Sequence, residues 1–144
     1  MLRQILAGGG INVINIAIHA MVMTVVVGVA RRASARRKSY SIVLLPAVMI
    51  PTVCVLMITH MLEVSIWASA YSVVDAAPPN TNVVYFAFVN YTTLGYGDIV
   101  PVERWRLFGP MTAMNGVLLF GWSTAVIFEV LRKTLERLEI SRRS

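Results

Sequence analysis

Three long apolar runs constrain the fold of this chain more than any other feature of its sequence. They cover residues 11–30, about 41–74, and about 107–131. About 20 consecutive apolar residues are enough to cross the hydrocarbon core of a bilayer as a helix. A chain of 144 residues that is 57% hydrophobic and 14% charged cannot bury that much apolar surface in one soluble domain. The sequence therefore predicts an all-α membrane protein with three transmembrane helices.

A cleaved signal peptide is the alternative interpretation of the first run. Arg3 would provide its charged start, and Gly28-Val29-Ala30 would provide its cleavage site. The apolar stretch is long for a signal peptide, and the dense positive charge after it would oppose translocation. We therefore expect residues 1–40 to form a transmembrane helix and a basic loop.

The basic residues lie at the ends of the apolar runs, which is typical of topology signals and lipid head-group contacts. The net charge is +6, and residues 31–38 carry no acidic residue. Positive loops favour the cytoplasmic side, so we expect the N-terminus outside and the C-terminus in the cytoplasm. The expected location is a plasma membrane, as in a bacterial inner membrane, with lipids and no nucleic acid as partners. The basic residues of this loop are Arg31, Arg32, Arg36, Arg37 and Lys38.

A different kind of segment separates the second and third runs. The second run, with Pro46 and Pro51 as possible kinks, ends at a helix-breaking stretch over residues 75–80. Candidate N-caps then precede a short helix predicted at 82–92, which is too short to span a membrane. Residues 92–98 cannot continue as a lipid-exposed helix, because non-helical backbone survives at membrane depth only in contact with protein or water. The sequence predicts a re-entrant loop. The candidate caps are Asn80, Thr81 and Asn82.

The residue types in this loop suit the passage of a dehydrated cation. Successive backbone carbonyls that point one way can replace the water around an ion. Gly95 and Gly97 tolerate the backbone conformations that this needs, and the hydroxyl of Thr93 can add oxygen donors. Tyr96 can face away from the ion and pack behind the loop, and the C-terminal end of the short helix favours a cation. One loop cannot surround an ion, so several copies are needed.

The run Thr92-Thr93-Leu94-Gly95-Tyr96-Gly97-Asp98 resembles the potassium channel signature T-x-G-Y-G-D, and the following Ile-Val-Pro is also typical. The resemblance implies a potassium channel pore domain at 41–131, with an outer helix (41–74), a pore helix (82–92), a selectivity filter (92–98) and an inner helix (107–131). It implies a homotetramer that conducts K⁺ and needs no other cofactor. Carried over by residue, it implies K⁺ binding at Thr93, Leu94, Gly95 and Tyr96, with Gly97 and Asp98 at the outer mouth.

The chain departs from this pattern at a few positions. Leu94 replaces the commoner valine but supplies the same carbonyl. Some small bacterial channels pair a pore-helix glutamate with the outer-mouth aspartate, and Val89 takes that place here. Tyr85 and Phe86 stand where tryptophans are common. The first span is absent from the minimal two-span pattern.

The third run holds candidate gating and pore-lining residues. Gly116 resembles the inner-helix glycine that often serves as a gating hinge. Asn115 either faces the cavity or fixes the packing of a neighbouring helix. Phe120, Thr124 and Phe128 recur every four residues, so they either line the inner pathway or pack against the second span.

Polar residues inside spans are candidate functional residues. Asn12, Asn15 and His19 share one face of the first span, which favours hydrogen bonds between helices, with proton or ligand sensing by His19 as the alternative. His60 and Glu63 are expected to form a structural pair near the outer surface, with Arg104 or Arg106, or else a pH-sensing pair. The sequence shows no further ligand at a spacing typical of a metal site.

Residues outside the spans and the loop carry weaker signals. Residues 132–144 are expected to be a cytoplasmic tail, and the charged segment 129–143 to form a small four-helix bundle, an interfacial helix or a frayed end. Cys54 is expected to face lipid or the core.

Two other functions fit a chain of this kind. One is a non-selective cation channel, against which Tyr96 argues, and the other is a non-conducting membrane sensor or partner on a channel scaffold. A small transporter would show repeats, which are absent. No enzyme constellation is visible, and no span carries the arginine series of a voltage sensor.

Overall fold

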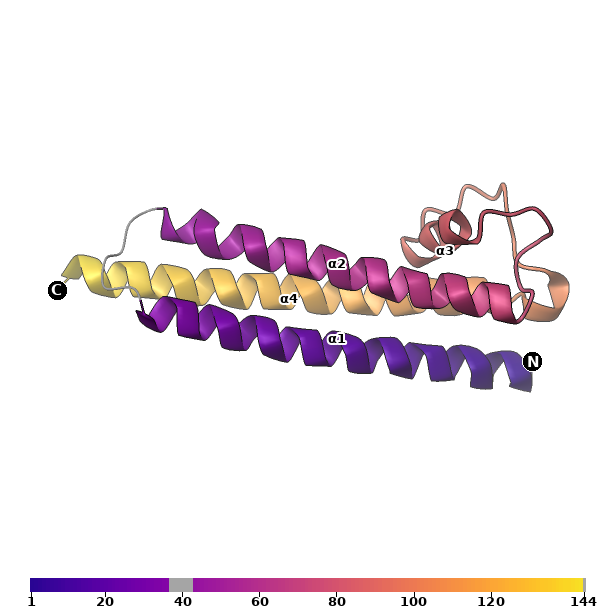
Figure 1. The fold of residues 1–144 in the computed structure, drawn as a ribbon, viewed down its shortest axis with the longest axis horizontal. Coiled ribbons are helices and arrows are strands. Elements are labelled where there is room, and N and C mark those ends of the chain that lie inside the picture. Colours follow the sequence, from indigo (N-terminus) through magenta and orange to yellow (C-terminus); the bar gives the residue numbers. More distant parts are fainter. Residues whose placement is uncertain (37–42, 144) are drawn as a thin grey trace.

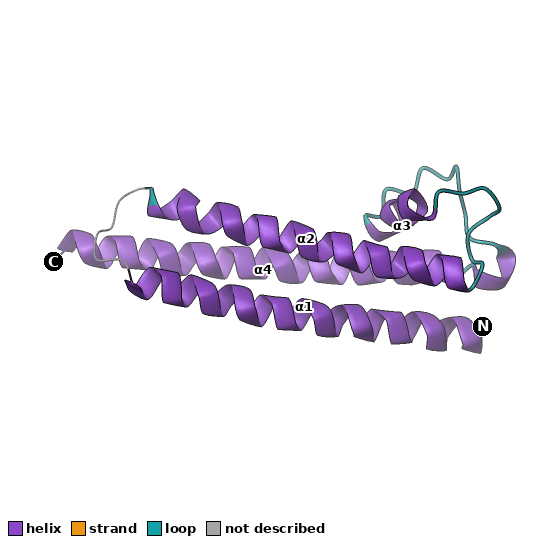
Figure 2. Cartoon of the chain, in the orientation of Figure 1, coloured by secondary structure: helices purple, strands orange, loops and turns teal. Residues whose placement is uncertain are grey.

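Four α-helices and one short 3-10 helix make up the fold. The computed structural model describes residues 1–36 and 43–143. No strand occurs in either of these two parts of the chain. The prediction of an all-α fold is therefore confirmed (Figure 2). In chain order, the elements are α1 (Leu2–Arg36), α2 (Leu44–Val73), α3 (Val83–Tyr91), η1 (Glu103–Trp105) and α4 (Phe108–Arg143).

The three long helices lie side by side, and the short helix α3 is at one end of them (Figure 1). α1 packs against both α2 and α4, and α3 also packs against α2 and α4. α1 and α4 run in the same direction, and α2 runs in the opposite one. The N-terminus is at the end that carries α3 and its loops, whereas the C-terminus is at the opposite end.

Three helical segments are long and apolar enough to cross a membrane, as predicted. They are Leu2–Val29, Leu44–Val73 and Glu103–Glu136, and no more than a third of each apolar window is buried inside the chain. Apolar side chains that remain exposed on long helices are stable where lipid surrounds them. The protein is therefore a multi-pass membrane protein.

α1 is longer than the predicted span at both ends. It begins at Leu2 rather than at residue 11. Gly8 lies within this added part of the helix and packs closely on α4, because a Cβ atom there would be 2.6 Å from Met111 Sδ. The helix also continues to Arg36, so the prediction of a loop over residues 31–36 is wrong. Arg37 and Lys38 lie outside the described residues.

α4 continues through the segment predicted as a separate tail. Glu129 pairs with Arg132 at 2.8 Å and with Lys133 at 2.5 Å, and Arg132 pairs with Glu136 at 2.8 Å. Opposite charges three and four residues apart support a helix on its exposed face. The charged segment is thus a continuation of the inner helix as far as Arg143, not a frayed end.

The buried interior has an apolar cluster at each end and polar side chains between them. The cluster near α3 includes Trp67, Tyr71, Phe86 and Phe108, and each of these is fully buried. The other cluster lies toward the far end of the long helices and includes Met23, Leu56 and Val126. Between them along α1, α2 and α4 lies a buried set, here named the polar layer: Asn15, His19, His60, Glu63, Asn115 and Ser123.

Candidate functional site

α3 occupies the position predicted for the pore helix. Asn82 is its N-cap, and the side-chain oxygen of Asn82 accepts hydrogen bonds from the N–H groups of Val84 and Tyr85, both at 3.1 Å. Such a cap satisfies N–H groups that have no partner within the helix. Phe86 and Tyr91 are fully buried, so the apolar residues of α3 fix it against α2 and α4.

The chain turns sharply where α3 ends. The N–H of Thr93 donates to the carbonyl of Asn90 at 3.1 Å, and the N–H of Leu94 donates to the carbonyl of Val89 at 3.0 Å. These two bonds use N–H groups of the loop and tie it to the last turn of the helix. The loop thus begins directly at the C-terminal end of α3, where the helix dipole is negative.

The backbone of the predicted filter alternates in the sign of φ. Thr93, Gly95 and Gly97 have φ values of +59°, +52° and +79°, whereas the residues between them have negative φ. A strand with one sign of φ points successive carbonyls to opposite sides. Reversing the sign at every second residue allows successive carbonyls to share a side, and glycine tolerates positive φ best.

The residues of the predicted filter are exposed in a single chain. Residues 92–98 are all exposed, and Tyr96 is 70% exposed. Among the described residues, no hydrogen bond ends on a carbonyl of residues 93–97. Because unpaired backbone groups are unstable in hydrocarbon, this loop requires water, ions or further protein around it.

Asp98, predicted at the outer mouth, has a partner on α3. The hydroxyl of Tyr85 donates to Asp98 Oδ2 at 3.3 Å. Val89, which takes the place of the glutamate found in some small channels, is buried. Partial desolvation of the Tyr85 hydroxyl and the nearby Asp98 carboxylate raise the pKa of Tyr85, so this phenol remains a hydrogen-bond donor.

The two outer-loop arginines do not reach His60 and Glu63, so that part of the prediction is wrong. Arg104 lies 3.8 Å from Asp75, and Arg106 lies 3.2 Å from Glu103. All four of these side chains are largely exposed. The arginines pair with exposed carboxylates of the segments on either side of α3 and its loop, whereas Glu63 is buried among the long helices.

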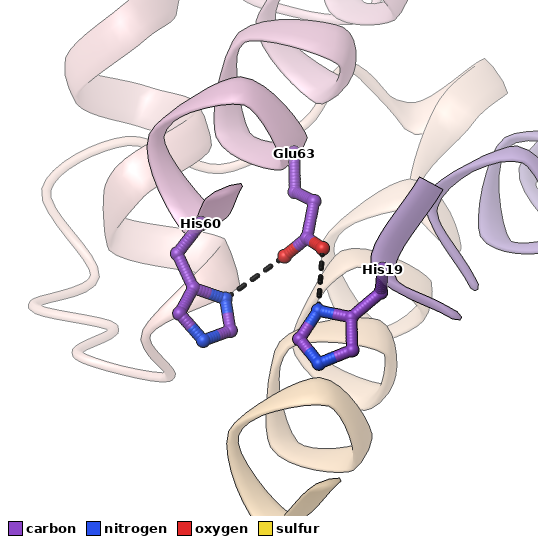
Figure 3. Close-up of side chains that lie close together, drawn as sticks. All are labelled: His19, His60 and Glu63. Atoms are coloured by element: carbon purple, nitrogen blue, oxygen red, sulfur yellow. Dashed lines mark hydrogen bonds and ion pairs between the residues drawn. The ribbon is translucent and has the colours of Figure 1, made fainter. Parts of the chain in front are cut away.

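Glu63 instead binds a histidine from each of two helices. Its Oε1 lies 2.8 Å from His19 Nδ1 of α1, and its Oε2 lies 2.8 Å from His60 Nδ1 of α2 (Figure 3). His19 and Glu63 are fully buried, and His60 is 9% exposed. The predicted pair of His60 and Glu63 is therefore part of a group of three that includes the first span.

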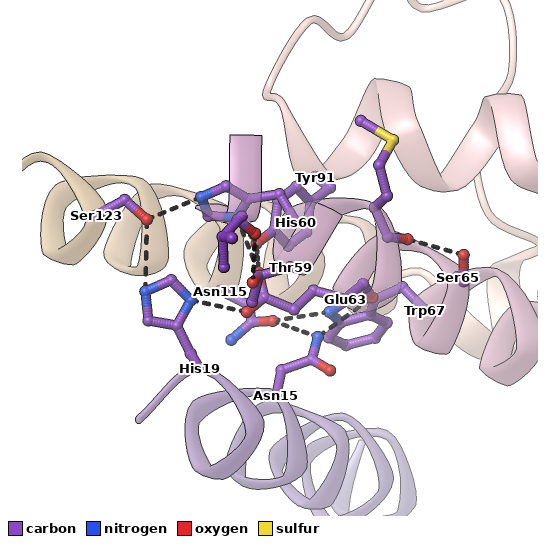
Figure 4. A network of polar contacts seen from close by, with 12 residues as sticks. Asn15, His19, Thr59, His60, Glu63, Ser65, Trp67, Tyr91, Asn115 and Ser123 are labelled. Atoms are coloured by element: carbon purple, nitrogen blue, oxygen red, sulfur yellow. Dashed lines mark hydrogen bonds and ion pairs between the residues drawn. The ribbon is translucent and has the colours of Figure 1, made fainter. Parts of the chain in front are cut away.

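The group extends to α3 and α4. The hydroxyl of Tyr91 donates to Glu63 Oε2 at 2.5 Å, and Ser123 Oγ lies 2.9 Å from His60 Nε2 and 3.4 Å from His19 Nε2 (Figure 4). Tyr91 is the last residue of α3, directly before the filter. Through Tyr91, the polar layer thus connects the first span to the start of the predicted filter segment.

Two asparagines form the other half of the polar layer. Asn15 Nδ2 donates to Asn115 Oδ1 at 2.9 Å and to the carbonyl of Glu63 at 3.3 Å, and Trp67 Nε1 donates to Asn115 Oδ1 at 3.0 Å. Asn115 is 1% exposed, so its side chain faces neighbouring helices of the same chain. Its contacts favour the packing alternative over contact with a hydrated ion.

Gly116 lies where α4 meets the end of α3. A Cβ atom at this position would be 2.0 Å from the carbonyl oxygen of Tyr91. Only glycine allows the two backbones to come this close. The structure therefore gives Gly116 a packing role, and its role as a hinge remains a prediction.

The three residues predicted to line the inner pathway differ in exposure. Phe120 is 37% exposed, and its ring centroid lies 4.6 Å from that of His60 and 5.3 Å from that of Tyr91. Thr124 is exposed and donates to the carbonyl of Phe120 at 2.9 Å. Phe128 is 64% exposed. Their surface on α4 is thus available to water, lipid or another chain.

The family model for ion channels matches residues 59–133, just over half of the chain. The chain therefore belongs to the ion channel family. The matched residues begin within α2 and include α3, the filter segment and most of α4, whereas α1 lies outside them. No curated protein and no solved structure matches the chain.

Sequence reasoning missed the grouping of His19 with His60 and Glu63, and the parts of Tyr91 and Ser123 in it. The polar face of the first span was a signal, because Asn15 and His19 both make the expected bonds between helices. The partners were not apparent, because they come from segments 44 and 104 residues away.

Proposed function

We propose that this chain forms a homotetrameric potassium-selective channel that conducts K⁺ passively. The observation that carries the proposal is the loop over residues 92–98, which follows α3, alternates in the sign of φ and has unpaired carbonyls. Backbone carbonyls in rings replace the hydration shell of K⁺. The carbonyls of Thr93, Leu94, Gly95 and Tyr96 are the expected ligands, with the Thr93 hydroxyl at the inner end.

Several copies of the chain are needed to complete such a pore. One chain supplies one filter strand, and a ring of carbonyls requires strands on every side of the ion. Tyr96 projects from the loop with 70% of its surface exposed, and a cleft of about 560 Å³ beside the loop is lined by Asn90, Pro101 and Gly109. The resemblance of the filter segment to potassium channels favours four copies.

The pathway on the inner side follows from the same arrangement. Phe120, Thr124 and Phe128 lie on exposed parts of α4, which suits the lining of an inner cavity. The dipole of α3 favours a cation at the end where the filter begins. We place the N-terminus and the filter outside and the C-terminus in the cytoplasm, because of the positive charge at the end of α1.

A reversal-potential measurement tests this function. The purified protein is placed in a planar bilayer with K⁺ on one side and Na⁺ on the other. We expect the current to reverse near the K⁺ equilibrium potential. Reversal near zero would indicate a non-selective cation channel, and the absence of current under all tested voltages and pH values would favour the non-conducting sensor.

The oligomeric state is a separate test. Native mass spectrometry of the detergent-solubilised chain should give four copies per particle. A stable monomer or dimer would contradict the proposed pore, because neither can enclose an ion with this loop.

A further inference from the structure

Four side chains from three helices bring nitrogen and oxygen donors together at one buried point. His19, His60 and Glu63 each offer one donor atom, and these three atoms lie within 4.8 Å of one another. The Tyr91 hydroxyl adds a fourth donor, 2.5 Å from Glu63 Oε2 and 3.0 Å from His60 Nδ1. We propose that these side chains form a zinc site in which both imidazoles bind through Nδ1.

The donor set suits zinc. Zn²⁺ prefers four ligands in a tetrahedron, and two histidines with one glutamate hold it in catalytic sites whose fourth position is open; here the Tyr91 hydroxyl would fill that position. Metal–ligand distances of about 2.0 Å place neighbouring donor atoms about 3.3 Å apart. The hydrogen-bonded donor pairs lie 2.5 to 3.0 Å apart, but His19 and His60 contact different oxygens of Glu63. The donor atoms of these three residues lie within 4.8 Å of one another, so the widest pair must close by about 1–2 Å when zinc binds. Rotation of the side chains about their own bonds is the motion that this closure requires.

Ser123 can accept a hydrogen bond from Nε2 of each histidine ring when both rings bind a metal through Nδ1. When a histidine binds a metal through Nδ1, its Nε2 carries the proton and donates it to a nearby oxygen. Ser123 Oγ lies 2.9 Å from His60 Nε2 and 3.4 Å from His19 Nε2, and a hydroxyl oxygen has two lone pairs to accept both protons.

Without a metal ion or an added proton, one histidine nitrogen in this group has no hydrogen-bond donor. If both Nδ1 atoms donated to Glu63, both Nε2 atoms of the neutral rings would be acceptors. Both face the hydroxyl of Ser123, which has a single proton to donate. One buried nitrogen would then lack a donor, unless the group took up an additional proton. A buried polar atom without a partner is costly, and either a metal ion or an added proton in this group removes that cost.

The charges also balance around zinc. Two positive charges on Zn²⁺ meet one negative charge on Glu63 and one on the Tyr91 phenolate, and the Tyr91 proton leaves to solvent on binding. A net charge of zero matters because the site is buried within membrane-spanning helices. No lysine or arginine side chain forms a hydrogen bond or an ion pair with this group in the described parts of the chain.

The proposed zinc site would give the first span a structural role in the protein. His19 lies on α1, outside the residues that match the ion channel family, whereas the other three ligands lie inside them. Zinc would hold α1 to α2 and to Tyr91, the residue just before the filter. A closed site of four protein ligands is typical of structural zinc.

Zinc content is the direct test. The untagged full chain is purified in detergent from cells grown with added Zn²⁺, and metals are measured by mass spectrometry. We expect about one zinc per chain. The His19→Gln and His60→Gln variants keep a polar side chain of similar size, and we expect at least about tenfold less zinc in each. Co²⁺ in place of Zn²⁺ should give the visible absorption of a four-coordinate ion.

Two further variants separate this site from other causes. Cys54 is the only thiol in the chain and is exposed, so Cys54→Ser should leave the zinc content unchanged. Ser123→Ala keeps all four ligands but removes the acceptor for both Nε2 protons, and we expect it to weaken zinc binding about 10- to 100-fold in competition with a chelator.

Several results would overturn the proposal. Folded wild-type protein that holds no zinc after growth with zinc and after direct addition would do so, as would equal zinc in wild type and in folded His19→Gln protein. Zinc-free protein whose K⁺ current depends on pH through His19 would assign the group to a proton instead. K⁺ selectivity without zinc overturns only this site, and zinc without K⁺ selectivity overturns only the proposed channel.

Discussion

At the scale of single residues, glycine is required at positions 95 and 116 for two different physical reasons. Gly95 has a φ of +52°, and a Cβ atom there would meet only the carbonyl oxygen of Thr93, at 3.8 Å. Its constraint is therefore conformational. Gly116 is helical, but a Cβ atom there would overlap the Tyr91 carbonyl. Its constraint is one of space.

We predict that Gly95→Ala abolishes K⁺ flux but leaves the assembly intact. An alanine at positive φ is strained by about 1–2 kcal/mol, so the carbonyls of the filter would relax out of line. K⁺ flux into liposomes and size-exclusion chromatography measure the two effects. Leu94→Val is the matched control, because it keeps the carbonyl and an apolar side chain and should keep the flux. Selective flux in Gly95→Ala would refute the filter assignment.

We predict that Gly116→Ala destabilises the protein strongly. The added methyl group would force α4 away from the end of α3, and overpacking of a well-packed interior costs about 1–3 kcal/mol or more. Gly121→Ala on the same helix is the control, since a Cβ atom there meets nothing within 4 Å. Thermal melting in detergent should show a clear drop for the first variant only. Equal melting temperatures would argue that Gly116 is not a packing residue.

At the scale of elements, the short helix α3 depends on its ends more than the long helices do. It has nine residues, and one side chain, Asn82, caps two of its N–H groups. Its other end is fixed by the Tyr91 hydroxyl on Glu63 and by the close approach of Gly116. Any change at either end should move the filter that follows.

We predict that Asn82→Ala lowers the stability of the folded protein by about 1 kcal/mol, because two N–H groups lose their acceptor. Asn82→Asp keeps an acceptor oxygen at the same place and should restore the stability. Denaturation followed by circular dichroism in detergent measures the difference. If alanine and aspartate behaved alike, the cap would not contribute to stability.

For the long helices, the lengths of the apolar runs predicted the existence of the spans but not their boundaries. The length of the apolar runs located all three spans, because crossing hydrocarbon sets a minimum length. The boundaries differed, since Gly8 and residues 31–36 lie within α1 and α4 passes residue 131 without a break. Glycines and charges are weak helix breakers when close packing or ion pairs at helical spacing favour the helix.

At the scale of the whole molecule, the arrangement predicts a definite orientation in the membrane. α3 and the loops beside it lie at the end of the bundle that carries the N-terminus, and the charged end of α4 lies at the other (Figure 1). Asp75 is largely exposed at the first end, and Glu136 is exposed at the second.

We predict that a membrane-impermeant thiol reagent labels Asp75→Cys from outside intact cells and labels Glu136→Cys only after the cells are opened. Both changes are made in a Cys54→Ser background, so that a single thiol is present. The positive charge at the end of α1 is the physical reason, because it favours the cytoplasmic side. The reverse labelling pattern would contradict both the orientation and the outer position of the filter.

The sequence by itself determined the number of spans, the all-α class and the position of the loop after α3. These follow from local properties, namely run length, N-cap chemistry and the incompatibility of residues 92–98 with a lipid-exposed helix. Only the tertiary structure decided the partners of the buried polar residues. His19, Glu63, Tyr91 and Ser123 come from four helices, and no periodicity along one helix specifies which side chains face it from another. Packing of the helices brings these residues together.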